Sequence, residues 1–258
     1  MHILWVFAQP EPTSLNARLR DAGLAQAREL GHEVVLSDLY AMKWKATVDG
    51  DDFTDGCGPI TAASQHAYHH GTLSADIRAE QSKLDRADAV VFQFPLWWYG
   101  MPAILKGWFD RVFVKGYAYG VRDAHGSTRR YGAGNLAGKR AMVITTTGSA
   151  EAALGPRGIN GHLDEILFPL LHGTLWYTGM SVLPPVAIHG ADHVDDDAYR
   201  QAADLVRGRV ATLDRAEPIR YRTQAGGDYD DDFVLRPWVA PGAGGLAAHR
   251  VDGVSGSG

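Results

Sequence analysis

Residues 93–113 read QFPLWWYGMPAILKGWFDRVF, and this stretch decides the fold. Its first two residues end an apolar run that is typical of a buried strand. An aromatic loop follows, and Pro102 then opens a helical pattern, because proline is favoured in the first turn of a helix. The apolar residues of that helix recur at helical spacing, at Leu105, Trp108, Phe109 and Val112. We therefore expect a strand, an exit loop and a helix in direct succession.

Further apolar runs rich in β-forming residues recur along the chain, and most of the segments between them have helical periodicity. Together with the run that ends at Phe94, there are five such runs, which span residues 3–8, 33–37, 89–94, 140–145 and 182–188. Strands that alternate with helices indicate a doubly wound parallel sheet, and right-handed crossovers leave few strand orders. We expect an α/β fold with five parallel strands in the order 2-1-3-4-5 and helices on both faces.

Capping residues and proline predict where helices begin and end. The first helix should begin at Thr13 or Ser14 and end at Gly31. A later helical pattern, from about residue 163 to residue 177, contains Pro169. Because proline interrupts a helix, we expect a kink or two short helices there.

The length of the chain is within reach of one α/β domain with a tail. We expect residues 1–216 to form that domain, because the regular pattern fades beyond it. Residues 217–239 should be an irregular segment packed on the domain or on a partner subunit. Residues 240–258 are rich in Gly, Ala and Ser, which predicts a flexible tail.

Composition and charge exclude several classes of function. The formal net charge is −5 without a basic block, so we expect no nucleic-acid partner. The apolar start, residues 1–8, is too short to cross a membrane, and we expect no membrane partner. A single cysteine, Cys57, favours a cytoplasmic location. His66, His69 and His70 could share a helical face, but no carboxylate stands at coordinating spacing, so we expect no metal site.

Three loops should meet where the strand order reverses, outside the carboxyl ends of the strands, which is where ligands bind in such sheets. They span residues 9–16, 95–101 and 145–160. The first offers hydroxyls and a helix N-terminus, which suit a phosphate. The second offers aromatic rings for a planar ring system, and the third offers hydroxyls and a glycine backbone for the polar edge of a heterocycle.

Each loop also has a plain structural explanation. Thr13 or Ser14 could simply cap a helix. Trp97 and Trp98 could belong to the core or to a dimer interface, because interfaces are rich in large aromatic side chains. The third loop could be an ordinary polar turn. No Gly-x-Ser-x-Gly elbow is present in the sequence, which leaves a hydrolase with little support.

Taken together, the loops and several neighbouring segments match one family. The matching segments are residues 8–16, 37–42, 73–77, 93–113, 139–148, 158–161 and 183–185. Over roughly residues 1–220 the chain resembles the NAD(P)H:quinone oxidoreductases, or DT-diaphorases, which are flavodoxin-like flavoproteins. The resemblance implies a homodimer with active sites at the subunit interface, FAD rather than FMN, and NAD(P)H as co-substrate. It also implies that a planar, quinone-like acceptor is reduced by a ping-pong hydride mechanism.

The resemblance further assigns roles to individual residues. The residues at or beside the FAD phosphates would be Gln9, Thr13, Ser14, Leu15 and Asn16. Those lining the isoalloxazine ring would be Pro95, Leu96, Trp97, Trp98 and Tyr99. Those at its polar edge and the ribityl chain would be Thr146, Thr147, Gly148 and Ser149, with Leu154 beside them. Tyr119 matches a family tyrosine at the substrate pocket.

Three positions depart from the family pattern. Leu154 and Asn160 stand where the family has a tyrosine and a histidine with a charge-relay role, and Gln9 stands where the animal enzymes have histidine. Asparagine can donate a hydrogen bond but cannot pass a proton near neutral pH. We expect Asn160 and Tyr119 to be the catalytic residues. Other planar acceptors, such as nitro, azo or biosynthetic compounds, are alternatives, and a non-catalytic flavin electron carrier is an alternative of another class.

Overall fold

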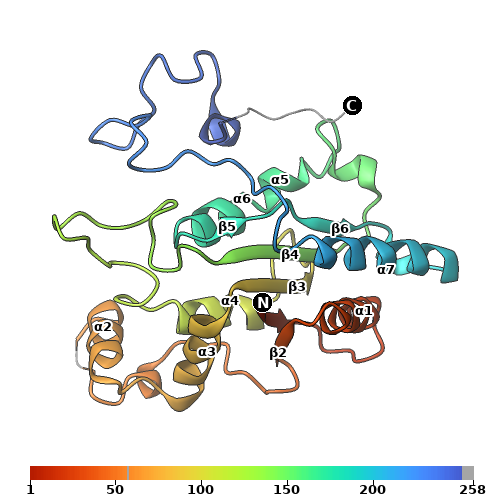
Figure 1. The fold of residues 1–258 in the computed structure, drawn as a ribbon, viewed down its shortest axis with the longest axis horizontal. Helices are drawn as coiled ribbons and strands as arrows, with labels where there is room; N and C mark the ends of the chain where they lie inside the picture. The colour runs from red at the N-terminus through yellow and green to blue at the C-terminus, as the bar shows by residue number, and fades with distance from the viewer. Residues whose placement is uncertain (57, 252–258) are drawn as a thin grey trace.

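The computed structural model describes residues 1–56 and 58–251, which form a parallel sheet covered by helices on both faces (Figure 1). Cys57 and residues 252–258 lie outside the described part. The strands follow the order β2-β1-β3-β4-β5, and β6 pairs with β4. Their bounds are β1 His2–Phe7, β2 Glu33–Asp38, β3 Ala89–Pro95, β4 Arg140–Thr146, β5 Ser181–Val182 and β6 Val186–Ile188. The doubly wound fold and the strand order expected from the sequence are confirmed.

Helices cover the two faces of the sheet unequally. The α-helices are α1 Leu15–Glu29, α2 Ile60–His70, α3 Ala75–Arg86, α4 Ala103–Val112, α5 Leu163–Ile166, α6 Phe168–Leu170 and α7 Asp196–Ala211. The odd-numbered residues of β1 face α1 and α7, and its even-numbered residues face the layer of α2, α3 and α4. This follows from the alternation of side chains along a strand. The central strand β3 is buried along its whole length.

The fifth strand differs from the expectation. Instead of one strand over residues 182–188, two short strands, β5 and β6, pair with opposite ends of β4. Pro184 and Pro185 lie between them. Proline has no backbone N–H to donate to a neighbouring strand, so the ladder stops at the two prolines and resumes at Val186. The sheet therefore has six strands, not five.

The helix boundaries follow local chemistry. Ser14, not Thr13, caps α1, because its Oγ accepts a hydrogen bond from the backbone N–H of Ala17 at 3.2 Å. Gly31 adopts a φ of 77° just beyond the helix end, as expected. The helix expected over residues 163–177 is interrupted at Leu167, shortly before Pro169 in the first turn of α6, and is divided into α5, α6 and the π-helical η3, Leu171–Trp176.

The histidines that raised the question of a metal lie on α2. His66 and His70 stack on each other with ring centroids 4.0 Å apart. Among residues 1–56 and 58–251, no three His, Cys, Asp or Glu side chains gather so that they could hold a metal ion. In the same part of the chain, no helix has the length and apolar character needed to span a membrane.

The C-terminal segment after α7 crosses over α5 and α6 (Figure 1, dark blue). Arg250 forms an ion pair with Asp164 of α5 at 2.9 Å, and Tyr221 is buried. Within the part expected to be a flexible tail, the short helix η5, Gly245–His249, buries Ala248. The domain limits at residues 216 and 239 stay predictions, and residues 252–258 of the expected tail lie outside the described structure.

A buried arginine joins α4 to two other segments. Arg111 Nη2 donates to Asp52 Oδ1 at 2.8 Å, and its Nη1 lies 2.7 Å from Asp76 Oδ2 of α3. Burial alone would lower the pKa of the guanidinium, but its bonds to the two carboxylates raise it. For Asp76, burial would raise the pKa, but hydrogen bonds from Arg111 and Ser74 outweigh burial and lower it.

The variant Arg111→Met should lower the free energy of unfolding by about 3–5 kcal/mol, because it leaves the carboxylate of Asp52 buried without its main partner. Urea denaturation at neutral pH measures this loss. The matched control is Arg207→Met, which removes an exposed ion pair with Asp204 and should cost less than about 1 kcal/mol. Equal stabilities of the two variants would contradict the prediction.

Candidate active site

The carboxyl ends of β1, β3 and β4 lie side by side, and the three predicted loops leave the sheet there. Backbone hydrogen bonds continue the pairing beyond the strands. The N–H of Ala8 donates to the oxygen of Gln93 at 3.0 Å, and the N–H of Leu96 donates to the oxygen of Thr146 at 2.8 Å. The loops therefore converge at one edge of the sheet, as expected from the strand order.

A buried hydrogen-bond chain holds the loops together from within. Asn16 Nδ2 donates to Thr146 Oγ1 at 2.5 Å, and Gln93 Nε2 donates to the backbone oxygen of Asn16 at 2.7 Å. Gln93 Oε1 accepts from Trp5 Nε1 at 3.0 Å. All four residues are buried, so the side chains of Asn16 and Thr146 serve to fix the loops. Their expected contacts with a cofactor stay predictions.

A cavity of about 400 Å³ opens between the second and third loops. It is lined by Leu96, Trp98, Tyr99, Thr147, Gly148, Ser149, Leu154 and Asp192. All but Asp192 were expected at the site from the sequence. One wall is apolar and largely aromatic, and another carries hydroxyls and peptide groups. A cavity of this size and lining suits a planar heterocycle.

The aromatic wall is held in a strained conformation. Trp98 and Tyr99 adopt φ values of 49° and 59°, in the left-handed region that side chains other than glycine disfavour. The backbones of Trp97 and Gly100 exchange two hydrogen bonds of 3.0 Å, which close the turn. Trp98 is 98% exposed. Strain of this kind clusters at functional sites, so the turn indicates a binding role for these rings.

Asn160 bridges the second and third loops. Tyr99 Oη donates to Asn160 Oδ1 at 3.0 Å, and Asn160 Nδ2 donates to Ser149 Oγ at 3.1 Å. The neighbouring Leu154 is buried at the cavity wall. Because an amide nitrogen carries two hydrogens, one N–H of Asn160 is not used by these bonds.

The first loop presents hydrogen-bonding groups without partners. In the described structure, the backbone N–H groups of Leu15 and Asn16 make no hydrogen bond, and they lie at the positive end of the α1 dipole. The amide oxygen of Gln9 is buried and also has no partner among the described residues. Thr13 is exposed beside them.

The remaining predicted residues lie outside the cavity lining. Pro95 is the buried last residue of β3, and Trp97 is 43% exposed. Tyr119 lines a different cavity of about 510 Å³, together with Met101 and Phe113. Asn160 is not a lining residue of the first cavity either, but it bonds to two of them, Tyr99 and Ser149. Tyr119 and Asn160 therefore lie at different cavities of one chain. Their catalytic roles stay predictions.

Asp192 is a cavity residue that sequence reasoning missed. It belongs to the short helix η4, Ala191–His193, which is tied to the third loop because the N–H of Ala191 donates to the oxygen of Thr147 at 2.9 Å. A side chain at Gly148 would approach Asp192 Oδ2 to within 2.2 Å, so the carboxylate would have to move to make room for it. No local motif marks Asp192, because its position depends on the pairing of β6 with β4.

Comparison with known proteins agrees with this geometry. A family model described as flavodoxin-like fold matches residues 1–209. Rat NAD(P)H dehydrogenase [quinone] 1 is 36% identical over 223 residues, which are 84% of this chain and 79% of that protein. The ribosyldihydronicotinamide dehydrogenase-like protein traD of Penicillium crustosum is 44% identical over 236 residues, which are 89% of this chain and 87% of that protein.

A solved structure is similar over nearly the whole chain. A proposed quinone reductase from Klebsiella pneumoniae is 47% identical, with a TM-score of 0.92. The match covers 97% of this chain and 99% of that protein's chain. These matches confirm the resemblance expected from the sequence, and with it an oxidoreductase as the class of enzyme. The chain belongs to the flavodoxin-like family of the NAD(P)H:quinone oxidoreductases.

Proposed function

We propose that this protein is an FAD-dependent reductase that transfers a hydride from NAD(P)H to a quinone-like acceptor by a ping-pong mechanism. The observation that carries the proposal is the cavity in which the rings of Trp98 and Tyr99 lie near the hydroxyls and peptide groups of residues 147–149. Relatives named as quinone dehydrogenases or reductases support the acceptor class. We also propose a cytoplasmic location, which the single cysteine favours.

The residues of the three loops fit a flavin. The unpaired N–H groups of Leu15 and Asn16 would bind the phosphates, and the buried oxygen of Gln9 would accept a hydrogen bond from the bound group. When bound, the flavin would supply the hydride-transfer chemistry that connects NAD(P)H with the acceptor. FAD is proposed over FMN because of the family resemblance.

The chain's own groups position the reactants and stabilise charge. Leu96 and Trp98 would hold planar molecules in contact, and proximity of this kind supplies much of the rate of a hydride transfer. The free N–H of Asn160 would stabilise negative charge on an acceptor oxygen. Leu154 keeps water from that corner of the cavity. Because Leu154 and Asn160 replace the relay pair of the family, the acceptor class is less strictly implied, and a nitro, azo or biosynthetic acceptor is the second candidate.

We propose a homodimer in which each active site lies at the subunit interface. Trp98, which lines the cavity, is 98% exposed, and Ile159, which precedes Asn160, is 96% exposed, so both offer apolar surface that a second subunit could bury. A second subunit that covers them would bring its own Tyr119 to the site. This accounts for the separation of Tyr119 from Asn160 within one chain.

The cofactor and the reaction are tested together. The purified protein is denatured and the released cofactor is identified by mass, and the intact protein is titrated with NADH or NADPH without oxygen. We expect FAD, and we expect the visible flavin absorbance to disappear on titration. Persistent absorbance would instead favour the non-catalytic electron carrier, and FMN in the mass spectrum would overturn the proposed cofactor.

The pH dependence tests the role of Asn160. No histidine lines the cavity. A plot of the rate of the acceptor half-reaction against pH should therefore show no ionisation near about 6.5, the pKa of histidine. Asn160→Ala should lower that rate by about tenfold, the usual worth of one hydrogen bond to a developing charge. Stopped-flow oxidation by a simple quinone measures both effects.

A matched control separates chemistry from loop position. Ser149→Ala removes one of the bonds that hold Asn160 but keeps the amide. It should therefore slow the acceptor half-reaction less than Asn160→Ala does. If the rate of the unmodified protein does change with an ionisation near pH ~6.5, the role proposed for Asn160 is wrong.

The shared active site is tested by mixing subunits. Tyr119→Ala and Asn160→Ala chains are each expected to be slow as homodimers. In a mixed dimer, one site of the two would combine the intact Tyr119 of one subunit with the intact Asn160 of the other. Random pairing makes about half of the dimers mixed, so about a quarter of the full activity should return in the mixture. Refolded mixtures are assayed at equal total concentration, and a mixture no faster than the mean of the two homodimers would contradict the arrangement.

A further inference from the structure

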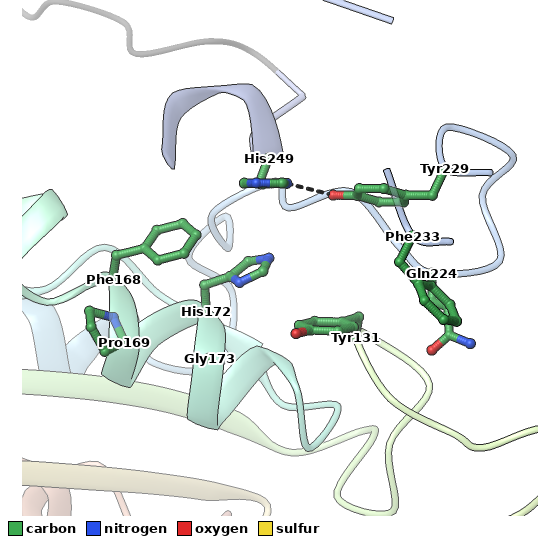
Figure 2. A pocket seen from close by; sticks show the side chains of 9 residues that line it. All are labelled: Tyr131, Phe168, Pro169, His172, Gly173, Gln224, Tyr229, Phe233 and His249. Carbon is green, nitrogen blue, oxygen red and sulfur yellow. Dashed lines mark hydrogen bonds between the residues drawn. The ribbon is translucent and has the colours of Figure 1, made fainter. Parts of the chain in front are cut away.

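A second cavity lies under the C-terminal segment (Figure 2). Its volume is about 340 Å³, within the range of small-molecule sites. It is lined by Tyr131, Phe168, Pro169, His172, Gly173, Gln224, Tyr229, Phe233 and His249, and we call it the aromatic slot. It shares no lining residue with the cavity at the ends of β3 and β4, and it shares only Pro169 with the cavity that Tyr119 lines. Four of its residues lie beyond residue 209, where the match to the family model ends.

Stacked rings form two walls of the aromatic slot. On one wall, His172 stacks on Phe168, with centroids 4.5 Å apart and planes 16° apart, and on Tyr131 at 5.1 Å. On the other wall, Tyr229 lies nearly parallel to His249, and Tyr229 Oη is 2.9 Å from His249 Nδ1. Figure 2 shows Tyr229 and His249 edge-on above Tyr131, which is also edge-on. At one end the walls meet, because the centroids of His172 and His249 are 5.7 Å apart. A flat ring would therefore lie at the other end, beside Tyr131 and Tyr229.

His172 carries a polar atom that the fold leaves without a partner. The residue is 9% exposed, and its Nε2 is buried and makes no hydrogen bond within the described residues. Burial, and to a smaller extent His249, lowers the pKa of His172 to about 4, so its ring is uncharged near neutral pH. An unpaired buried polar atom is costly, and a hydrogen bond from a ligand would remove that cost.

Backbone strain marks the slot as it marks the first cavity. Six non-glycine residues in the described chain have a positive φ, and four of them are aromatic. Two of these, Trp98 and Tyr99, line the first cavity, and the other two, Tyr131 at 47° and Phe233 at 63°, line the slot. Strained residues persist where the surrounding structure holds a functional geometry.

We propose that the aromatic slot is a second ligand site, which binds an uncharged, planar aromatic compound with a hydroxyl group, such as a phenol. The ring would lie between Tyr131 and Tyr229, and its hydroxyl would donate to Nε2 of His172. No Asp, Glu, Lys or Arg is part of the lining, although Arg130 contacts two lining residues, Phe233 and Gln224. The lining itself therefore favours an uncharged ligand. The site does not depend on the flavin.

The test uses 2-naphthol as the probe and naphthalene, the same ring system without the hydroxyl, as its control. Binding to the intact protein is measured by calorimetry while the visible spectrum of the bound flavin is recorded. We expect 2-naphthol to bind without changing that spectrum, because the slot lies apart from the first cavity. A spectral change that follows saturation would place the probe at the flavin and overturn the proposal. Failure of the proposed flavin chemistry would not alter the calorimetric result.

Variants locate the binding site. His172→Phe keeps a flat apolar ring and should weaken binding of 2-naphthol by about tenfold without weakening that of naphthalene. Phe233→Ser removes part of a wall and should weaken both probes, whereas Val234→Ser, at an exposed neighbour outside the lining, should weaken neither. If His172→Phe does not fold, the comparison of probe affinity between Phe233→Ser and Val234→Ser tests the location of the site. Unchanged affinity in Phe233→Ser, or no binding to the unmodified protein, would overturn the proposal.

Discussion

The first cavity depends on one buried chain of hydrogen bonds, from Trp5 through Gln93 and Asn16 to Thr146. These residues belong to β1, β3, α1 and β4, and each one satisfies a polar group that would otherwise be buried without a partner. In a low-dielectric interior such a chain is strong and directional. It therefore fixes the relative positions of the three loops without occupying the space in which a ligand would lie.

The two cavities are built on different principles. The first uses the edge of the sheet, so its position is set by strand order and by the hydrogen-bond chain behind it. The aromatic slot uses the π-helix η3 and the segment after α7, so its shape depends on how that segment packs on the helix. The ion pair between Arg250 and Asp164 attaches the segment after α7 to α5. One rigid scaffold thus carries a cavity common to its fold and a pocket formed by its extension.

The sequence predicted the features that rest on local rules or on strand order. Ser14 as a cap, the break near Pro169 and the convergence of three loops follow from hydrogen bonding and from the topology of parallel sheets. Asp192 could not be found, because its approach to Gly148 depends on the register of β6. The slot was missed for a similar reason. His172 and His249 are 77 residues apart, and only packing of the C-terminal segment brings their rings to 5.7 Å.

The interruption of the outer strand at Pro184 and Pro185 also bears on how this protein behaves in concentrated solution. The free edge of a sheet can recruit a strand from another molecule and begin aggregation. Here β5 and β6 are two and three residues long, and the two prolines between them offer no N–H to an incoming strand. The division of the strand thus protects this edge of the sheet, opposite β2, against pairing with another molecule.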